Sequence, residues 1–345
     1  MNTTTRSTAP PVGAEPEDVT RRPSRIAQFV ARFGLLIAWV VVCVIFSVLP
    51  QTADIFPTVD NLASILGSQA VIAVLTLALV VPLVTGDYDL SVAYTLTLSA
   101  MLIAILNVQH GWPILAAVTV ALAVGAAIGV VNALIVLFFR IDSLIVTLGT
   151  GTFIGGIVLW ISGSNTISGL APGLVDWVIV KRVLNIPIAF YYVLALALVM
   201  WYVFELTPVG RRMLFVGRGR NVARLSGVNV ERIRLGSFVM SGVIAAFGGV
   251  IYAGTTGAAD PTSGTQLLLP AFAAAFLGAT TIYPGRFNPI GALAAVYFLV
   301  TGITGFQLLG AQSYVQQLFY GGALVLAVAL SQLARKRQTL EAGSG

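Results

Sequence analysis

The sequence predicts an all-α membrane protein that crosses the bilayer about ten times. Hydrophobic residues make up 57% of its 345 residues and charged residues only 9%, and the mean hydropathy is +0.94. Several apolar runs are as long as the roughly 20 residues that a helix needs to cross a bilayer. Basic residues gather at alternate ends of these runs, as they do in polytopic membrane proteins.

The apolar runs define the expected spans and the limits of a transmembrane domain, 29–334. Residues 1–28 are rich in Thr, Pro, Glu and Arg without an apolar core, so we expect a disordered cytoplasmic tail. A second cytoplasmic tail covers 335–345, and the longest polar interruption is the loop 207–235. The predicted spans cover residues 33–49, 63–84, 90–106, 114–138, 144–161, 188–206, 235–253, 267–282, 289–306 and 315–333.

The basic residues give this layout an orientation. Of the 19 lysines and arginines, only Lys181 and Arg182 fall on one side of the predicted membrane, and all the others fall on the opposite side. Cytoplasmic loops carry the excess of basic residues in membrane proteins. An even number of spans then places both termini in the cytoplasm.

Composition also excludes several functions. The net charge of +6 would suggest nucleic acid in a soluble protein, but these arginines border spans, so we expect no nucleic-acid binding. Cys43 is the only cysteine and His110 the only histidine, which leaves no metal site and no catalytic cluster of these residues. No GxxxxGK[ST] motif occurs, so the chain binds no ATP in that way by itself.

The densest cluster of charge is the arginine segment, residues 210–235, which contains Glu231 as its one acid. Asn221 is placed to cap a short helix over 222–226, and Gly227 supplies the left-handed residue that ends such a helix. Its arginines are Arg211, Arg212, Arg218, Arg220, Arg224, Arg232 and Arg234.

A second helix is expected directly after the first. Asn229 is its predicted N-cap, and Val228 and Ile233 occupy the two positions of a hydrophobic staple. A segment built in this way has a defined shape. Two interpretations stay open from these residues: a solvated cytoplasmic loop that obeys the positive-inside rule, or a docking surface for a soluble partner.

Two acidic sites stand at the starts of predicted spans. Asp89 has the position of an N-cap for the third span, and Asp260 precedes the eighth. The predicted topology puts Asp89 toward the inner face and Asp260 toward the outer face. This relation is that of an inverted repeat, which is common in transporters.

Four segments in this order resemble the permease subunits of bacterial ATP-binding cassette (ABC) importers of the ribose/xylose/galactose type. They are GDYDLSVAYTLTLSA (86–100), IDSLIVTLGT (141–150), RLSGVNVERIR (224–234) and FLGATTIYPGRFNPIGAL (276–293), and the resemblance extends over 63–333. Asp87 stands where the family's first motif has a second glycine, and Ala93 where a glycine is usual. Phe287 and Asn288 replace a more typical Gly-Ser pair.

The resemblance implies a permease that carries no enzymatic activity and binds no cofactor of its own. It implies a second copy or a similar permease as partner, a cytoplasmic ATPase that uses ATP and Mg, a periplasmic sugar-binding protein, and the bacterial inner membrane. It also implies that 221–227 is a coupling helix that seats in the ATPase. The implied coupling residues are Arg218, Arg220, Asn221, Val222, Ala223, Arg224, Leu225, Ser226, Gly227, Asn229 and Glu231, and the motif or helix-cap residues are Gly86, Asp87, Asp89, Ser91, Asp260, Gly278, Gly285 and Arg286.

Other function classes stay open at this stage. An ABC permease for branched-chain amino acids or nucleosides would have a similar sequence and a different binding protein. An ion-coupled secondary transporter would place an ionisable residue near the middle of the membrane, whereas the acids here lie at span ends. A membrane enzyme would need a cluster of nucleophile, base or metal ligands.

Overall fold

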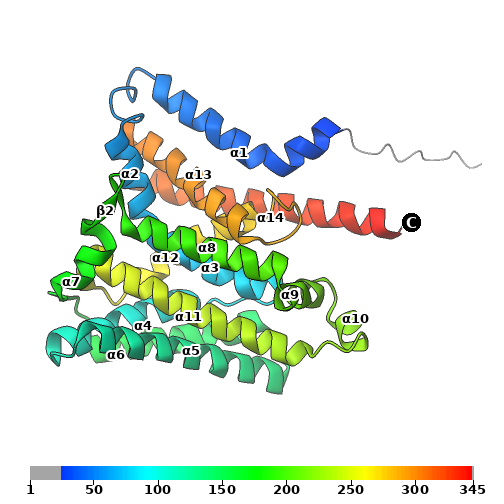
Figure 1. The fold of residues 1–345 in the computed structure, drawn as a ribbon, viewed down its shortest axis with the longest axis horizontal. Coiled ribbons are helices and arrows are strands. Elements are labelled where there is room, and N and C mark those ends of the chain that lie inside the picture. Colours follow the sequence, from blue (N-terminus) through cyan, green and yellow to red (C-terminus); the bar gives the residue numbers. More distant parts are fainter. Residues whose placement is uncertain (1–24, 344–345) are drawn as a thin grey trace, which may run out of the picture.

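The computed structural model describes residues 25–343, which are helical over most of their length (Figure 1). Two short π-helices are also present, η1 (Ile105–Gln109) and η2 (Asp176–Val180). Strand β1 (Ile167–Ser168) pairs antiparallel with β4 (Ala258–Ala259), and β2 (Arg182–Val183) with β3 (Ile186–Pro187). The helices are α1 (Arg25–Val48), α2 (Val59–Ser68), α3 (Ala70–Val84), α4 (Val92–Ala104), α5 (Ile114–Phe139), α6 (Ser143–Ser162), α7 (Pro172–Val175), α8 (Ile188–Leu206), α9 (Pro208–Arg218), α10 (Arg220–Leu225), α11 (Val230–Thr256), α12 (Ser263–Gly278), α13 (Pro289–Leu308) and α14 (Ser313–Gly343).

The prediction of an all-α polytopic membrane protein is confirmed. Within the described residues, α5, α6, α8, α11, α13 and the continuous pair α4–η1 are long and apolar enough to cross a membrane. Helices α2 and α3, which meet at an angle of 43°, are long and apolar enough to cross a membrane only when they are taken together. Shorter apolar stretches lie in α1, α12 and α14. The count of ten crossings, the side of the termini and the inverted repeat stay predictions.

The structure covers the two predicted tails to different extents. Residues 1–24 of the predicted disordered tail lie outside the described residues, whereas 25–28 belong to α1. Helix α14 continues without a break beyond the predicted span end at 333 and reaches Gly343.

Helix α3 is the centre of the bundle. All of its residues are buried, and it packs against α8, α11, α12 and α13. A helix that is apolar on every side belongs in the interior, because it has no polar face to turn toward water. Hydropathy alone cannot separate such a helix from one that faces lipid.

Helix α11 packs closely against α5, through glycines on both helices. A methyl group added at Gly125 would lie 2.5 Å from the Cβ of Ala246, and one added at Gly129 would overlap the backbone of Phe238. Gly242 meets the backbone of Gly125 in the same way. Small residues allow this approach, which membrane helices need because their association depends on packing.

The bundle has two distinct ends (Figure 1). Helix α7 and the strand β2 lie at one end, and α9 and α10 lie at the other, together with the C-terminal end of α14. The arginine segment is therefore gathered at a single end.

Candidate functional site

The first half of the arginine segment is a helix, α9, where a loop was predicted. Thr207 caps it by accepting a hydrogen bond from the backbone N–H of Gly210 at 3.3 Å, and Met213 and Val216 are buried beneath it. A Cβ at Gly217 would overlap the carbonyl of Val84, the last residue of α3. The end of α9 thus rests directly on the end of the central helix.

The short helix α10 begins earlier than predicted. Its N-cap is Gly219, whose carbonyl accepts the first helical bond from the N–H of Ala223 at 2.9 Å. The prediction that Asn221 caps this helix is wrong, because Asn221 lies inside the first turn and is exposed.

The end of α10 is as predicted. Gly227 has φ +80°, and its N–H donates to the carbonyl of Arg224 at 3.0 Å. The N–H of Val228 donates to the carbonyl of Ala223 at 3.0 Å, which completes a Schellman motif. The left-handed conformation of Gly227 is therefore confirmed and closes the helix.

The start of α11 is also as predicted. The side chain of Asn229 accepts a hydrogen bond from the N–H of Arg232 at 2.9 Å, so the predicted N-cap is confirmed. Val228 and Ile233 both pack against the small buried cluster of Val216, Ala223 and Val230. The angle between α10 and α11 is therefore fixed by packing.

Helix α10 presents apolar side chains to the outside. Leu225 is 89% exposed and Val222 is 58% exposed, while Ala223 faces inward. Arg224 pairs with Glu231 of α11 at 2.5 Å on the same surface. The result is a rigid, exposed surface that combines apolar groups with charge.

Asp87 ties this surface to the membrane domain. It lies in the loop between α3 and α4 (85–91, the inner loop), and its side chain is only 2% exposed. Arg234 of α11 binds both of its carboxylate oxygens, with Nε to Oδ2 at 2.8 Å and Nη2 to Oδ1 at 2.6 Å. Arg220, the first residue of α10, approaches Oδ1 at 2.9 Å and donates to the carbonyl of Gly86 at 2.8 Å. A buried carboxylate requires such partners, because it has lost its hydration.

Asp89 holds the other half of the inner loop. Its Oδ1 accepts hydrogen bonds from the N–H and the hydroxyl of Ser91, at 3.1 and 2.6 Å, and its Oδ2 accepts from the hydroxyl of Ser241 at 2.9 Å. The prediction that Asp89 is the N-cap of the next span is wrong. Helix α4 begins at Val92, and Ser91 is its N-cap, because the carbonyl of Ser91 accepts the first bond from Thr95.

Buried polar side chains extend this network into α5 and α6. Asn132 of α5 donates to the hydroxyl of Ser91 at 2.8 Å and accepts from Thr150 of α6 at 2.7 Å. Sequence reasoning missed Asn132, Thr150 and Ser241. A lone amide within an apolar span is the signal that could have found Asn132, because polar groups are costly there without partners.

The inner loop is also bound to α6 through its backbone. The N–H of Tyr88 donates to Ser143 at 3.0 Å, and the N–H of Leu90 donates to Thr147 at 3.0 Å. Asp142 accepts from the N–H of Leu144 at 2.8 Å and caps α6. The start of α6 is thus positioned by the same loop that holds Asp87.

A polar cleft of about 910 Å³ separates α10 from the start of α6. Gly86, Asp87 and Tyr88 of the inner loop line it, and so does Arg140, which ends α5 with φ +56°. The cleft brings Gly86 and Asp87 together with four residues of the arginine segment. Its polar lining residues are Asp87, Tyr88, Arg140, Asp142, Ser143, Arg220, Arg224, Glu231 and Arg234.

The remaining motif residues lie between α12 and α13, away from this cleft. Gly278 lets the end of α12 contact the backbone of Ala292, and Gly285 turns the chain with φ +82°. Arg286 forms an ion pair with Glu205 at the end of α8. Asn288, one of the departures from the family motif, caps α13 by accepting from the N–H of Gly291 at 2.6 Å.

Asp260 fixes a turn at the opposite end of the bundle. Its carboxylate accepts from the N–H and the hydroxyl of Thr262, both at 2.7 Å, and from Thr166 at 3.1 Å. These hydrogen bonds hold the pKa of Asp260 below its usual range, and the bond from the Thr262 hydroxyl makes the largest contribution. The N-cap of α12 is Thr262, so Asp260 shapes the turn before the helix.

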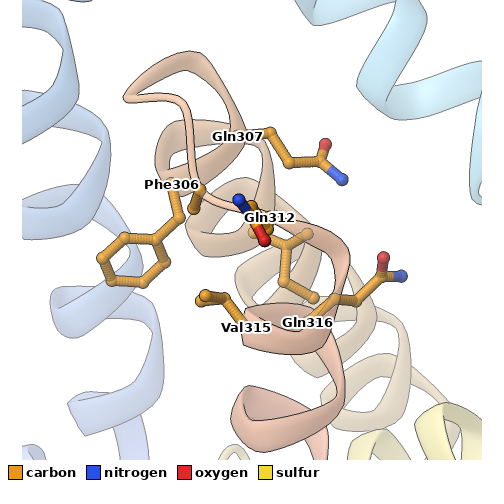
Figure 2. A pocket seen from close by; sticks show the side chains of 7 residues that line it. Phe306, Gln307, Gln312, Val315 and Gln316 are labelled. Atoms are coloured by element: carbon orange, nitrogen blue, oxygen red, sulfur yellow. The ribbon is translucent and has the colours of Figure 1, made fainter.

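A small pocket between α13 and α14 contains three glutamines. Figure 2 shows the side chains of Gln307 and Gln316 extending on one side of it and Phe306 on the other. Its volume is about 10 Å³, which is close to the minimum for one water molecule. The pocket is therefore too small for a sugar.

The apolar bundle and its single arginine-rich end define a multi-pass α-helical membrane protein with a rigid surface outside the spans. The chain belongs to the family described as the branched-chain amino acid transport system/permease component, whose family model matches residues 61–328. This membership confirms the resemblance to bacterial ABC importer permeases that the sequence motifs predicted.

Curated relatives agree with this assignment. The D-allose transport system permease protein of Escherichia coli is 29% identical over 316 residues, which cover 92% of this chain and 96% of that protein. The ribose import permease protein of Escherichia coli is 32% identical, over 85% of this chain and 91% of that protein. The autoinducer 2 import system permease protein of Photorhabdus laumondii is 30% identical, over 74% of this chain and 78% of that protein. No solved structure matches the chain.

Proposed function

We propose that this chain is the membrane-spanning subunit of an ABC importer and forms the pathway for a monosaccharide of the ribose, xylose or galactose type. The names of the allose and ribose permeases, which align over most of their length, support a sugar more than a branched-chain amino acid or a nucleoside. The substrate would be delivered by a periplasmic sugar-binding protein, and the membrane would be the bacterial inner membrane.

The observation that carries the proposal is the shape and surface of α10. Its Schellman motif and the staple of Val228 and Ile233 hold it rigid, yet Leu225 and Val222 are exposed at the arginine-rich end. Val222 and Leu225 lie one turn apart on this helix, and neighbouring exposed apolar groups rimmed by charge favour an interaction site. Of the two interpretations left open by the sequence, this surface supports the docking surface, with a cytoplasmic ATPase as the partner.

The proposed topology has ten crossings with both termini in the cytoplasm. The shorter apolar stretches of α1, α12 and α14 and the bent pair α2–α3 would complete the number. They overlap the spans predicted at 33–49, 267–282, 315–333 and 63–84. Arginines at the α10 end then obey the positive-inside rule.

The proposed mechanism contains no covalent chemistry in this chain. ATP and Mg are used by the partner ATPase, and a second copy or a similar permease completes the pathway. Closure of the ATPases would move α10, and loaded binding protein would act on the outer loops. The two partners need only bind the two states of the permease with different affinity, since this difference shifts the equilibrium between them.

Asp89 provides the discriminating observation against an ion-coupled transporter. It is 1% exposed and thus has the burial expected of an ion or proton site. Its oxygens, however, already accept three hydrogen bonds, from Ser91 and Ser241. This arrangement supports a structural role for the carboxylate.

Uptake by a reconstituted complex tests the proposal. The permease, the ATPase and the binding protein from the same source are assembled in vesicles with ATP inside, and radiolabelled D-ribose, D-allose, leucine and adenosine are added outside. We expect sugar uptake that requires ATP and binding protein and is unchanged by an uncoupler. Uptake that persists without ATP and stops with the uncoupler would contradict the proposal, and uptake of leucine or adenosine alone would contradict the substrate class.

A further inference from the structure

The inner loop connects α10 to the membrane domain through charged groups. Arg220 is the first residue of α10, and its guanidinium bridges the carbonyl of Gly86 at 2.8 Å and the carboxylate of Asp87 at 2.9 Å. Any displacement of α10 therefore pulls on two consecutive residues of this loop.

Asp87 is also anchored from a second side. The bidentate contact from Arg234 fixes the orientation of the carboxylate, and the side chain of Arg234 is only 14% exposed. Bidentate arginine–carboxylate pairs restrict geometry more than single hydrogen bonds do. Asp87 is thus shared between the short helix and the base of α11.

The same loop is hydrogen-bonded to α6 within three residues of Asp87. Tyr88 and Leu90 donate their backbone N–H groups to Ser143 and Thr147, which lie one turn apart on α6. Each of these bonds joins loop and helix directly. The distance along the chain from the ion pair to the first of these bonds is a single residue.

The space between α10 and α6 is open. The cleft of about 910 Å³ has Arg220 and Arg224 on one side and Asp142 and Ser143 on the other. The inner loop also lines this cleft, and its hydrogen bonds to Arg220 and to Ser143 and Thr147 join α10 to α6.

We propose that Arg220 and Asp87 form a joint through which displacement of α10 reaches α6. The inference rests on the proposed function, since it assumes that a partner moves α10. Asp87 is one of two positions, with Ala93, at which the first segment departs from the family pattern it resembles. Both residues act as positioning residues and contact no substrate.

The test measures motion of α6 in the full complex. Thr152 is exposed on α6 and is changed to cysteine in a Cys43→Ser background, then labelled with bimane. Arg220→Gln cuts the joint but leaves the Asp87–Arg234 pair satisfied, so the fold is retained. Arg212→Gln, an exposed change of equal charge on α9, is the matched control. Asp87→Asn is the second variant, and copurification of the ATPase verifies assembly.

We expect ATP to shift the bimane emission in the wild type and in Arg212→Gln. The shift, and the stimulation of ATP hydrolysis by binding protein loaded with D-ribose or D-allose, should fall by about fivefold or more in Arg220→Gln and Asp87→Asn. Arg220→Lys should recover part of both responses, because an ammonium can reach Asp87 or the Gly86 carbonyl.

The inference is overturned if assembled Arg220→Gln and Asp87→Asn complexes keep the wild-type emission shift. It is also overturned if the wild type transports sugar while the label at Thr152 does not respond. Failure of the wild type to transport any substrate with ATP would instead reject the proposed function, so the two failures are distinguishable.

Discussion

Replacing Gly227 by valine should loosen the end of α10 without touching its packing. Gly227 has φ +80°, and nothing lies within 4 Å of a Cβ built there, so the expected penalty is conformational. A left-handed residue with a side chain costs about 1 to 2 kcal/mol, and a β-branched residue is the least tolerated. That cost makes the form in which the end of α10 is locally unfolded roughly 5 to 30 times more populated.

Hydrogen exchange measures this population directly. The amide of Val228 is protected by its bond to the carbonyl of Ala223, so its exchange should accelerate by roughly 5- to 30-fold in Gly227→Val. Asparagine tolerates the left-handed conformation, so Gly227→Asn should give a smaller effect. Substrate-stimulated ATP hydrolysis should likewise decrease more in Gly227→Val than in Gly227→Asn.

Gly219 supplies the control at the other end of the same helix. Its φ of −176° is open to any residue, and a Cβ there would make an ordinary contact of 3.7 Å with Val222. Serine also suits the N-cap position, so Gly219→Ser should not accelerate the exchange of Val228. Equal exchange in Gly227→Val and the wild type, or equal acceleration in Gly219→Ser, would refute the reasoning.

Three further predictions concern the bundle. Transport should be highest in the wild type, lower in Asp89→Asn and lowest in Asp89→Ala. Alanine leaves the Ser91 and Ser241 donors without an acceptor, which costs about 1 to 3 kcal/mol of stability. If Asp89→Asn is as inactive as Asp89→Ala in ATP-driven uptake, the result would favour an ion site. Gly242→Leu should abolish a folded bundle, because its side chain would enter the backbone of α5; normal abundance and a normal melting temperature in detergent would contradict this packing. Cysteines at Asn107 and Gly310 should react with an impermeant maleimide in intact cells and one at Gly219 should not, and labelling at Gly219 from outside would reject the topology.

The features predicted correctly from sequence are local ones. Gly227 and Asn229 were recognised because a left-handed glycine and an N-cap act on backbone groups only a few residues away. Asn221 fitted the same rule, but the helix begins at Arg220, whose guanidinium is held by the inner loop far away in sequence. Local signals locate an element within a few residues, and tertiary contacts then select its first residue.

The candidate site depends on contacts that sequence patterns do not contain. Ser241, the partner of Asp89, lies 152 positions further along the chain, and Arg234, the partner of Asp87, lies 147 positions further. Helix α9 was predicted as part of a loop because its arginines interrupt the apolar runs that mark the spans. In the structure Gly210 and Gly217 let it contact the backbones of Phe204 and Val84 closely.

The burial of α3 has a consequence for the order of assembly. This helix is made early, but α8, α11, α12 and α13, which surround it, all follow it in the chain. At a synthesis rate of about 5 to 20 residues per second, α13 emerges roughly ten to forty-five seconds after α3. During that interval lipid tails must cover the sides of α3 that protein covers later. The centre of the finished bundle is therefore a surface that first has to release lipid, and a chain interrupted before α11 would leave its most apolar helix in the bilayer without its neighbours.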